Sequence, residues 1–341
     1  MIVFDNIIAL LQRTGGISVM FNEIYLRLHR DGVDFSVFGF SLQRLDAASR
    51  NSPPRLLERY RDFSGVLPQK KNSAVFHSTY YRLPIDPSYK VVTTVHDFTY
   101  ERAVGGVPRW VHSIQKNRAI RGSDKVICVS ENTKSDLLFY LPDTPPEKIC
   151  VIYNGVSEGF YPDPLIAKKE VVLFVGQRSR YKNFRSVVLA LSKSSSLTLE
   201  CVGGGGFTKL ELELLERYVP NRYCHLGYVT ELDLNLAYNR ALCLVYPSLY
   251  EGFGIPVLEA MRAGCPVIAV NTSSIPEVAG DAGLLLEKAD PCGIYDAIEK
   301  VQSMDVRNNL IRKGIVQSSK FSWESTYSET LSVYKEMLIG G

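Results

Sequence analysis

The chain carries the sequence LYEGFGIPVLEA over Leu249–Ala260. Pro256 has the fixed backbone angle that suits a first helical position, so the pattern predicts a helix that begins beside Ile255. Glu251 then lies in the loop before the helix and Glu259 in its first turns, with seven residues between them. The stretch therefore predicts a loop-to-helix turn that presents two carboxylates near one helix end.

The start of this predicted helix is a candidate anion site. Gly252 and Gly254 let a ligand approach the backbone closely. The helix dipole favours an anion here, because the first N–H groups of a helix have no intrahelical partner. We expect the donors to be the N–H groups of Phe253, Gly254 and Ile255. Together with the carboxylates, they predict a site for a phosphorylated sugar.

Short apolar runs alternate with amphipathic helical stretches along the whole chain, which is typical of parallel α/β domains. In the first half the predicted strands are Ile2–Phe4, Phe35–Phe40, Ala74–His77, Val91–Val95, Lys125–Val129 and Cys150–Tyr153. In the second half they are Val171–Val175, Leu197–Val202, a short strand before Gly227, Leu242–Tyr246, Val267–Val270 and Gly283–Leu286. Because the alternation restarts, we expect two Rossmann-like domains joined by the proline-bearing segment 154–169.

Length and composition agree with two domains and exclude some functions. A chain of 341 residues is long for one core. The net charge of +3 is too small for a typical nucleic-acid-binding protein, so we expect no nucleic-acid partner. The seven cysteines include no Cys-x-x-Cys pair, the first residues lack a signal-peptide pattern, and no apolar run is long enough to span a bilayer. These features predict a cytoplasmic protein with free thiols.

The loop after the predicted strand at 171–175 carries cations beside a glycine. Its sequence, GQRSRYKNF over 176–184, contains Arg178, Arg180 and Lys182. Ligands of parallel α/β domains bind at loops of this kind, beyond the carboxyl ends of the strands. Arginine grips phosphate oxygens in a fork and lysine supplies a compact charge, so the loop is suited to a diphosphate. We expect Arg180 to be a solvated surface cation.

The loop Gly203–Gly206 follows the next predicted strand and allows close backbone approach. It lacks the third glycine of the G-x-G-x-x-G dinucleotide fingerprint, and no Walker-type sequence occurs in the chain. A dehydrogenase built from two Rossmann-like domains is therefore disfavoured. Nicotinamide binding would be the observation that distinguishes it.

The glutamate pair and its surroundings resemble the retaining nucleotide-sugar glycosyltransferases of family 4, whose signature is two glutamates separated by seven residues. The matching flanks are YPS at 246–248, AGCPVIA at 263–269 and IPEV at 275–278. The resemblance implies the α/β GT-B fold, in which two Rossmann-like domains face each other across a cleft. It implies an acceptor-binding domain over 1–155, a nucleotide-sugar-binding domain over 156–322, and a C-terminal helix over 323–341 that crosses back to the first domain.

The resemblance also implies roles for the charged residues of the second domain. Glu251 would hydrogen-bond hexose hydroxyls and orient the ring, while Glu259 would bind the ribose hydroxyls. Arg178 and Lys182 would stabilise the negative charge that grows on the leaving diphosphate, together with the helix end near Gly254. Retention at the anomeric carbon is implied as well, with the leaving diphosphate helping to deprotonate the acceptor.

Backbone contacts complete the implied donor site. The resemblance places Gly204 near the nucleotide and the backbone of Val229 against the base. In the first domain, Gly16 belongs to the glycine loop TGGIS at 14–18, which lies between a predicted strand and a helix. Its N–H groups would contact the donor from the opposite side.

Two histidines end predicted strands of the first domain. His96 is followed by Asp97, and the resemblance implies that this histidine contacts the donor sugar. His77 ends the preceding strand and could line the acceptor side, but we expect a structural role for it.

The chain contains no Asp-x-Asp motif of the type that holds a divalent cation on a sugar diphosphate. Glu231 and Asp233 lie at a predicted helix start, where acids favour the dipole without a metal. We therefore expect catalysis with no metal ion and no cofactor.

The donor is narrowed to two candidates. UDP-glucose or another UDP-hexose is favoured, and GDP-mannose is the alternative, because the segment Tyr181–Phe184 also looks like that of bacterial mannosyltransferases. A non-enzymatic alternative is a scaffold protein that binds sugar nucleotides without catalysis. The presence of Glu251, Glu259, Arg178 and Lys182 argues against this alternative. Hydrolysis of the donor in the absence of an acceptor would distinguish an enzyme from a scaffold.

The expected acceptor is a glycan or a lipid-linked saccharide. The stretch Arg109–Arg121 predicts a basic helix with some apolar positions, which is suited to an anionic bilayer near such an acceptor. An exposed ordinary helix explains the same pattern. If the protein contacts a membrane, we expect a peripheral contact at the inner face of the cell membrane.

Overall fold

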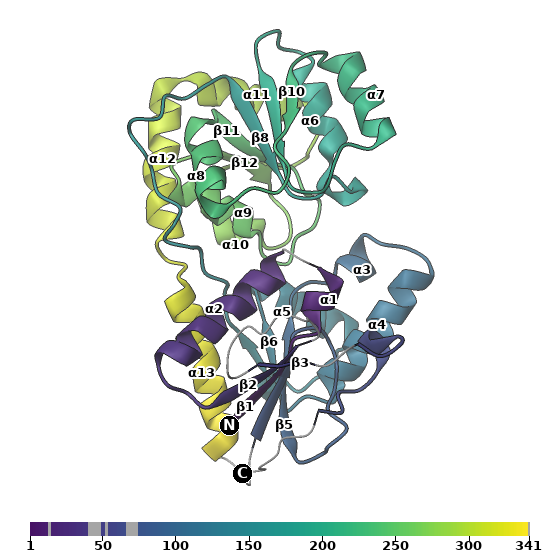
Figure 1. Cartoon of the computed structure of the whole chain (residues 1–341). Helices are drawn as coiled ribbons and strands as arrows, with labels where there is room; N and C mark the ends of the chain where they lie inside the picture. Colours follow the sequence, from purple (N-terminus) through teal and green to yellow (C-terminus); the bar gives the residue numbers. More distant parts are fainter. Residues whose placement is uncertain (13–14, 40–48, 52–53, 66–73, 340–341) are drawn as a thin grey trace. The chain divides into compact units, whose positions relative to one another are not determined.

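The computed structural model describes residues 1–12, 15–39, 49–51, 54–65 and 74–339. The chain divides into two compact units (Figure 1). The first unit comprises Met1–Gly155 and Trp323–Gly341, and the second comprises Val156–Ser322. Within the ranges described, no helix combines the length and the apolar composition needed to cross a membrane.

The first unit is built on a parallel sheet. In the described part of the chain, this sheet has seven strands in the order β3-β2-β1-β4-β5-β6-β7. Strand β1 pairs with β2 and β4, so that Ile2 lies opposite Phe35 on one side and Val75 on the other. The strands are β1 Ile2–Asp5, β2 Phe35–Gly39, β3 Ser49–Asn51, β4 Ala74–Ser78, β5 Tyr89–Val95, β6 Lys125–Cys128 and β7 Ile149–Val151.

Helices cover the faces of this sheet (Figure 1). The aromatic side chain of Phe4 on β1 meets Phe21 of the second helix edge to face at a centroid distance of 6.3 Å. The α-helices are α1 Ile8–Leu11, α2 Gly16–Arg30, α3 Thr99–Arg102, α4 Val107–Arg121, α5 Glu131–Tyr140 and α13 Trp323–Ile339, and the short 3-10 helices are η1 Glu58–Tyr60 and η2 Pro146–Lys148.

The C-terminal helix α13 belongs to the first unit, where it packs against α2 and β4. His77 on β4 is fully buried, with its Nδ1 atom 2.6 Å from the Tyr334 hydroxyl and its Nε2 atom 2.9 Å from Thr94 Oγ1. Burial lowers the pKa of His77 to about 3, so the ring is neutral near pH 7. At the helix start, Glu324 accepts hydrogen bonds of 2.8 and 2.9 Å from Arg30. His77 thus has the structural role expected of it.

The second unit contains its own parallel sheet. Its described residues form six strands in the order β10-β9-β8-β11-β12-β13. Numbered from its first strand, this is the order 3-2-1-4-5-6 of a doubly wound Rossmann sheet. The strands are β8 Val171–Val175, β9 Thr198–Val202, β10 Tyr223–His225, β11 Cys243–Tyr246, β12 Val267–Val270 and β13 Leu284–Leu286.

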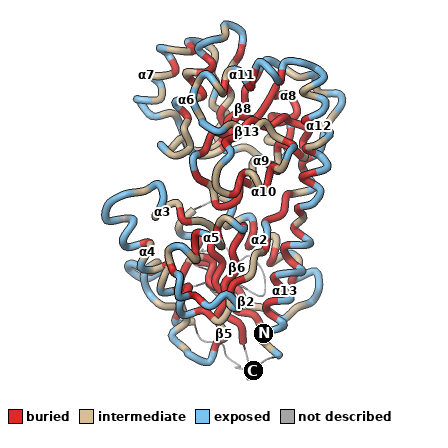
Figure 2. The backbone as a smooth tube through the Cα atoms, turned by 180° about the vertical axis from the view of Figure 1, so that it is seen from behind, coloured by how far each residue is buried: buried red, intermediate tan, exposed pale blue. Residues whose placement is uncertain are grey.

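The strands of both sheets form the buried centre of each unit (Figure 2). On one face of the second sheet, the helix α11 packs against α6, and Val187 and Ile298 are fully buried between strand and helix layers. On this unit the helices are η3 Arg180–Lys182, α6 Phe184–Leu191, α7 Lys209–Tyr218, α8 Glu231–Arg240, α9 Ile255–Arg262, α10 Ile275–Ala279, α11 Pro291–Gln302 and α12 Met304–Ser318.

The strand order reverses between β8 and β11 in the second sheet and between β1 and β4 in the first. At such a point the connections leave to opposite faces, so the loops that follow the two strands leave room for a ligand. In the second unit these are the loops that carry Lys182 and Glu251. The topology therefore brings together two segments that lie far apart in the sequence.

The predicted strands are all present, and their ends differ from the prediction by at most two residues where both ends are described. Phe40, the predicted end of one strand, lies outside the described residues. Strand β3 was not predicted, because its three residues, Ser49–Asn51, show no apolar pattern. The expected α/β fold with two Rossmann-like domains is confirmed.

The segment 154–169, expected as a connection, lies mostly on the second unit. The boundary between the units falls after Gly155. Beyond it, the backbone N–H of Tyr161 donates to Asn235 Oδ1 at 3.1 Å, and the ammonium of Lys168 donates to the carbonyl of Gly264 at 3.1 Å. The part of the chain that is free to act as a connection is therefore shorter than its composition suggests.

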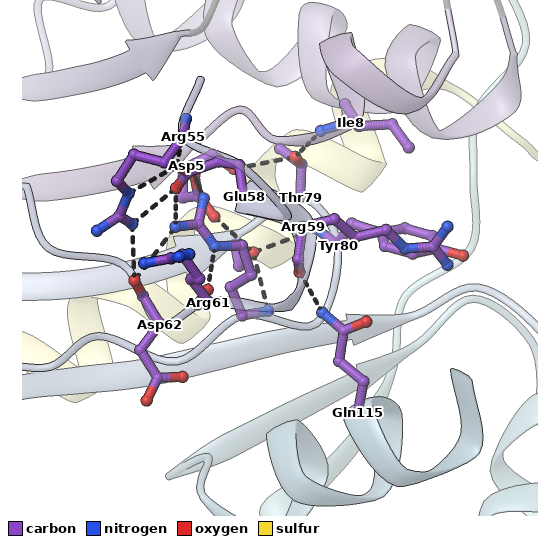
Figure 3. A network of polar contacts seen from close by, with 12 residues as sticks. Asp5, Ile8, Arg55, Glu58, Arg59, Arg61, Asp62, Thr79, Tyr80 and Gln115 are labelled. Carbon is purple, nitrogen blue, oxygen red and sulfur yellow. Dashed lines mark hydrogen bonds and ion pairs between the residues drawn. The ribbon is translucent and has the colours of Figure 1, made fainter. Parts of the chain in front are cut away.

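A buried ion network anchors the segment 54–62 to the end of β1 (Figure 3). The Arg82 guanidinium donates to Asp5 Oδ1 at 2.9 Å and to Glu58 Oε1 at 2.7 Å, and all three side chains are almost completely buried. Arg55 donates to the other oxygen of Glu58 at 2.7 Å. Both carboxylates are paired, which is the condition under which burying them is tolerated.

We expect Arg82→Ala to lower the free energy of unfolding of the first unit by about 3–5 kcal/mol, because it leaves the buried Asp5 carboxylate without its cation and leaves Glu58 paired with Arg55 alone. Urea unfolding measures the change. The matched control is Arg118→Ala, which removes a cation from an exposed pair with Asp62 and should cost about 1 kcal/mol or less. Equal losses in the two variants would contradict the importance of the buried network.

Candidate active site

The central feature of the second unit is an ion pair between Lys182 and Glu251. Lys182 ends η3 in the loop after β8, and Glu251 lies in the loop after β11. The Lys182 Nζ atom is paired with Glu251 Oε1, and it also lies 3.3 Å from the Tyr246 hydroxyl. The pair is therefore located where the strand order of the second sheet reverses. The contacts of these side chains with a diphosphate and a hexose stay predictions.

The charge of Lys182 is stabilised by its surroundings. Burial alone would lower the pKa of this ammonium, but the Glu251 carboxylate and the hydroxyls of Tyr246 and Tyr181 outweigh it and raise the pKa well above its usual range. Lys182 therefore remains a cation at physiological pH. A cation fixed beside an open loop is suited to negative charge on a ligand.

Hydrogen bonds with two serines hold the loop that carries Glu251. Ser273 Oγ accepts the Glu251 N–H at 2.9 Å. Ser274 Oγ lies 3.0 Å from the Glu251 carbonyl and 2.9 Å from the Phe253 carbonyl, and it is fully buried. The Leu249 N–H donates to the Tyr181 carbonyl at 2.8 Å, which ties this loop to the one after β8. The carboxylate is thus positioned by the backbone of two loops.

The helix α9 begins at Ile255 with Pro256 in its first turn, as predicted. Gly254 precedes it with a φ of +107°, a conformation that side chains disfavour, and a Cβ atom there would lie 2.9 Å from Ile275 Cδ1. Phe253 is buried and meets the ring of Phe321 edge to face at 5.9 Å. The N–H groups of Gly254 and Ile255 lie at the start of the helix, so the helix offers them no carbonyl.

Glu259 lies one turn into α9, where it is partly buried. The hydroxyl of the fully buried Tyr238 donates to Glu259 Oε2 at 3.0 Å. Burial raises the pKa of Glu259 from its usual 4.5 to about 7, although the hydrogen bond from Tyr238 works against the rise. Glu259 and Glu251 therefore lie on either side of the same helix start. Tyr238 holds Glu259, and Lys182 holds Glu251.

Arg178 is engaged by the glycine turn Gly203–Gly206. Its guanidinium donates to the carbonyls of Gly203 at 3.1 Å, Gly205 at 2.7 Å and Gly206 at 2.9 Å, and its Nε atom donates to Glu211 at 3.1 Å. Its side chain is only 2% exposed. Gly203, Gly204 and Gly205 all have a positive φ, which lets the turn direct its carbonyls at the guanidinium. The contact of Arg178 with a diphosphate stays a prediction.

Gly204 and Val229 lie on neighbouring turns. A Cβ atom on Gly204 would lie 2.7 Å from the carbonyl of Gly176, so only glycine fits at this position. The N–H of Gly203 donates to the carbonyl of Gly227 at 2.8 Å, two residues before Val229. The turns after β9 and β10 are therefore tied together, and their contacts with a nucleotide stay predictions.

The first unit places Gly16 and His96 at the carboxyl ends of its own strands. Gly16 is the first residue of α2, and Thr14, which begins the predicted glycine loop, lies outside the described residues. His96 directly follows β5. Its Nε2 atom is buried and finds no hydrogen-bond partner among the residues described. Burial lowers the pKa of His96 to about 4, so the ring is neutral near pH 7.

Four supporting residues were not predicted from the sequence: Tyr246, Tyr238, Ser273 and Ser274. Tyr246 and Ser274 lie within or beside stretches that resemble the family, but spacing alone does not show what their hydroxyls contact.

In the described ranges, no three side chains of histidine, cysteine, aspartate and glutamate gather into a metal-binding group.

Comparison with known proteins agrees with this geometry. Residues 14–159 match the family described as Glycosyltransferase Family 4, and residues 162–317 match the family described as Glycosyl transferases group 1. The chain belongs to the family 4 glycosyltransferases. The resemblance seen in the glutamate pair and its flanks is thereby confirmed, and the protein is an enzyme that transfers a glycosyl group.

Relatives of this glycosyltransferase have been named in Escherichia coli. The O-antigen chain mannosyltransferase B is 29% identical over 283 residues, which cover 76% of this chain and 74% of that protein. The serotype-specific mannosyltransferase WbdA is 26% identical over 280 residues, which cover 74% of this chain but only 34% of that protein.

A solved structure shares the fold of this glycosyltransferase. Sucrose-phosphate synthase from Thermosynechococcus elongatus aligns over 100% of this chain and 99% of its own, with a TM-score of 0.79 and 17% identity. The likeness confirms the two-domain α/β GT-B fold that the resemblance implied.

The ionisation of Glu259 predicts a pH dependence of stability. Its pKa is about 7 in the folded protein and returns to about 4.5 on unfolding, so the folded chain keeps a proton that the unfolded chain releases between these values. The contribution of Glu259 to stability is therefore full below about pH 4.5 and is lost as the pH rises through 7, by at most about 3 kcal/mol. Urea unfolding at pH 5 and pH 8 should show a fall in the wild type that Glu259→Gln removes. Parallel pH profiles of the two proteins would contradict the assignment.

Proposed function

We propose that this glycosyltransferase moves a mannosyl residue from a nucleoside diphosphate donor to a glycan or lipid-linked saccharide. The proposal includes retention at the anomeric carbon and catalysis without a metal ion. The observation that carries it is the Lys182–Glu251 pair at the start of α9. This arrangement offers a cation to phosphate and a carboxylate to sugar hydroxyls within one pair of loops.

The names of the relatives support mannose as the sugar. Both E. coli relatives are mannosyltransferases, and they align with about three quarters of this chain. GDP-mannose, the alternative in the sequence analysis, is therefore our first candidate for the donor. UDP-glucose or another UDP-hexose, which the sequence favoured, is the second.

In the proposed reaction, the bond between the anomeric carbon and the diphosphate oxygen breaks while the acceptor oxygen attacks from the same face. The acceptor proton passes to the leaving diphosphate, so the protein need not supply a nucleophile. Lys182 and the N–H groups of Gly254 and Ile255 stabilise the charge that develops on the diphosphate. Glu251 orients the hexose and Glu259 binds the ribose. The anomeric configuration of the product, determined by NMR, tests retention.

The first-unit residues and Arg178 have supporting roles in this proposal. Gly16 would contact the donor through its backbone N–H, and His96 would contact the sugar as a neutral ring. Arg178 would act at the diphosphate while its guanidinium holds the glycine turn in shape. Gly204 and Val229 would border the nucleotide and its base. The orphaned Nε2 atom of His96 supports its role, because a buried polar atom without a partner is costly unless a ligand completes it.

We expect Lys182→Ala and Glu251→Ala each to lower the rate of nucleoside diphosphate release from the donor by roughly 100-fold or more. Because the two side chains act as a pair, the double variant should lose much less than the product of the two single losses. The matched control is Arg180→Ala, an exposed cation in the same loop, which should retain the wild-type rate. Wild-type rates in both single variants would remove the proposed site.

A thermal-shift screen tests the donor. A ligand that binds only the folded state raises the unfolding midpoint, so GDP-mannose should produce a larger shift than UDP-glucose, UDP-galactose or ADP-glucose. The shift and the activity should be the same with EDTA. A larger shift with a UDP-hexose would replace mannose by the second candidate. Activity that is lost with EDTA and restored by magnesium would contradict the metal-free mechanism, and no shift with any donor would contradict the proposed donor site.

A further inference from the structure

Lys116 lies on α4 of the first unit with its side chain fully buried. A lysine is almost never fully buried unless its ammonium is paired. The partner here is Glu101 of α3, whose Oε2 atom lies 2.6 Å from Lys116 Nζ and whose side chain is only 6% exposed. Ser113, three residues earlier on α4, donates to the other oxygen of Glu101 at 2.7 Å. Two side chains of α4 therefore hold α3 against this helix (Figure 1).

The same ammonium also contacts the backbone that connects β5 to α3. Lys116 Nζ donates to the carbonyl of Asp97 at 3.0 Å, and it lies 3.9 Å from the centre of the fully buried Phe98 ring. The Asp97 carboxylate accepts the N–H of Thr99 at 2.9 Å, which closes the turn from its other side. The connection is thus fixed at its first carbonyl by the lysine and at its end by the start of α3.

His96 is the residue between β5 and this connection. Its Nε2 atom has no hydrogen-bond partner among the described residues, so no bond of that kind holds the ring at this atom. The ring of Phe21 lies at a centroid distance of 6.3 Å. The direction of the imidazole therefore depends on the backbone of His96, because the backbone angles decide which side-chain rotamers are allowed. Lys116 holds the carbonyl of the very next residue.

We propose that Lys116 is a positioning residue, which holds His96 for its contact with the donor sugar by fixing the Asp97 carbonyl. The inference rests on the proposed function, since it requires that His96 contacts the sugar. Lys116 is itself fully buried, so it acts through the backbone and not as a ligand of the sugar. A displacement of about 1 Å at a contacting group can cost roughly 100-fold in rate, so an interior lysine can have a measurable effect on catalysis.

A purely structural role for Lys116 is the competing explanation. Removal of the lysine alone leaves Glu101 as an uncompensated buried charge, which destabilises the protein in either case. The double variant Lys116→Met with Glu101→Gln separates the two explanations, because it removes both charges and still lacks the donor to the Asp97 carbonyl. A structural role predicts that this variant regains both stability and activity. Positioning predicts that it regains stability alone.

The test combines urea unfolding with steady-state rates of nucleoside diphosphate release by the full-length protein. The donor is GDP-mannose, or UDP-glucose if the thermal-shift screen selects it. We expect the double variant Lys116→Met with Glu101→Gln to unfold near the urea midpoint of the wild type. Its kcat should fall about tenfold, while the KM for the donor changes much less. Adding His96→Ala to it should give a triple variant that is no slower than His96→Ala alone, because the lysine acts through the histidine.

Two further variants serve as controls. Ser113→Ala removes one hydrogen bond to Glu101 but keeps the Lys116 contact with the Asp97 carbonyl, so its kcat should match the wild type. Lys116→Arg keeps a cation and donors at this position and should retain most of the wild-type kcat. It keeps the test decisive if the double variant does not fold.

Each other outcome contradicts the proposal. A wild-type kcat in the double variant would overturn it, as would a triple variant slower than His96→Ala by the full factor of the double variant. A loss in Ser113→Ala or in folded Lys116→Arg that equals the loss in the double variant would assign the effect to the packing of α3. A wild-type rate in His96→Ala would overturn both the role of this histidine in the proposed function and the inference. A slow His96→Ala beside a normal double variant would overturn the inference alone.

Discussion

The ion pair between Lys182 and Glu251 is the interaction on which the site of this glycosyltransferase depends. It joins the loops that follow β8 and β11, the two strands between which the order of the sheet reverses. The hydrogen bond from the Leu249 N–H to the Tyr181 carbonyl joins the same loops through the backbone. With the loops fixed in this way, the start of α9 is held beside a cation, where the proposed diphosphate would meet both.

Hydrogen bonds to hydroxyl groups and to the backbone of a glycine turn also hold the charged side chains in position. Tyr246 contacts Lys182, Tyr238 contacts Glu259, and Ser274 binds two carbonyls of the loop that carries Glu251. The glycine turn after β9 surrounds Arg178 with carbonyls. Such groups cost little to bury because their hydrogen bonds are made within the protein, and they keep flexible side chains in one position before a ligand arrives.

In the first unit, a buried ion network likewise fixes the position of a segment, here 54–62. The buried pair of carboxylates on Arg82 fixes a segment whose outer side chains are apolar and exposed. A network that is costly to bury is retained where it gives a surface segment a defined shape, and here that segment lies against α4. The loops that carry Lys182 and Glu251 and the segment beside α4 are thus both held by buried or half-buried ion pairs.

The sequence by itself determined the alternation of strands and helices, the start of α9 at Ile255, and the glutamate spacing that indicates the family, because these depend on local periodicity and on the backbone angle of proline. It did not indicate β3, whose three polar residues pair only at a sheet edge. Only the tertiary structure showed that Lys182 reaches Glu251, that Arg178 is held by the glycine turn, and that the segment 54–62 lies against α4. These contacts join residues that are distant in the sequence, and their geometry follows from strand order and packing, which no local pattern encodes.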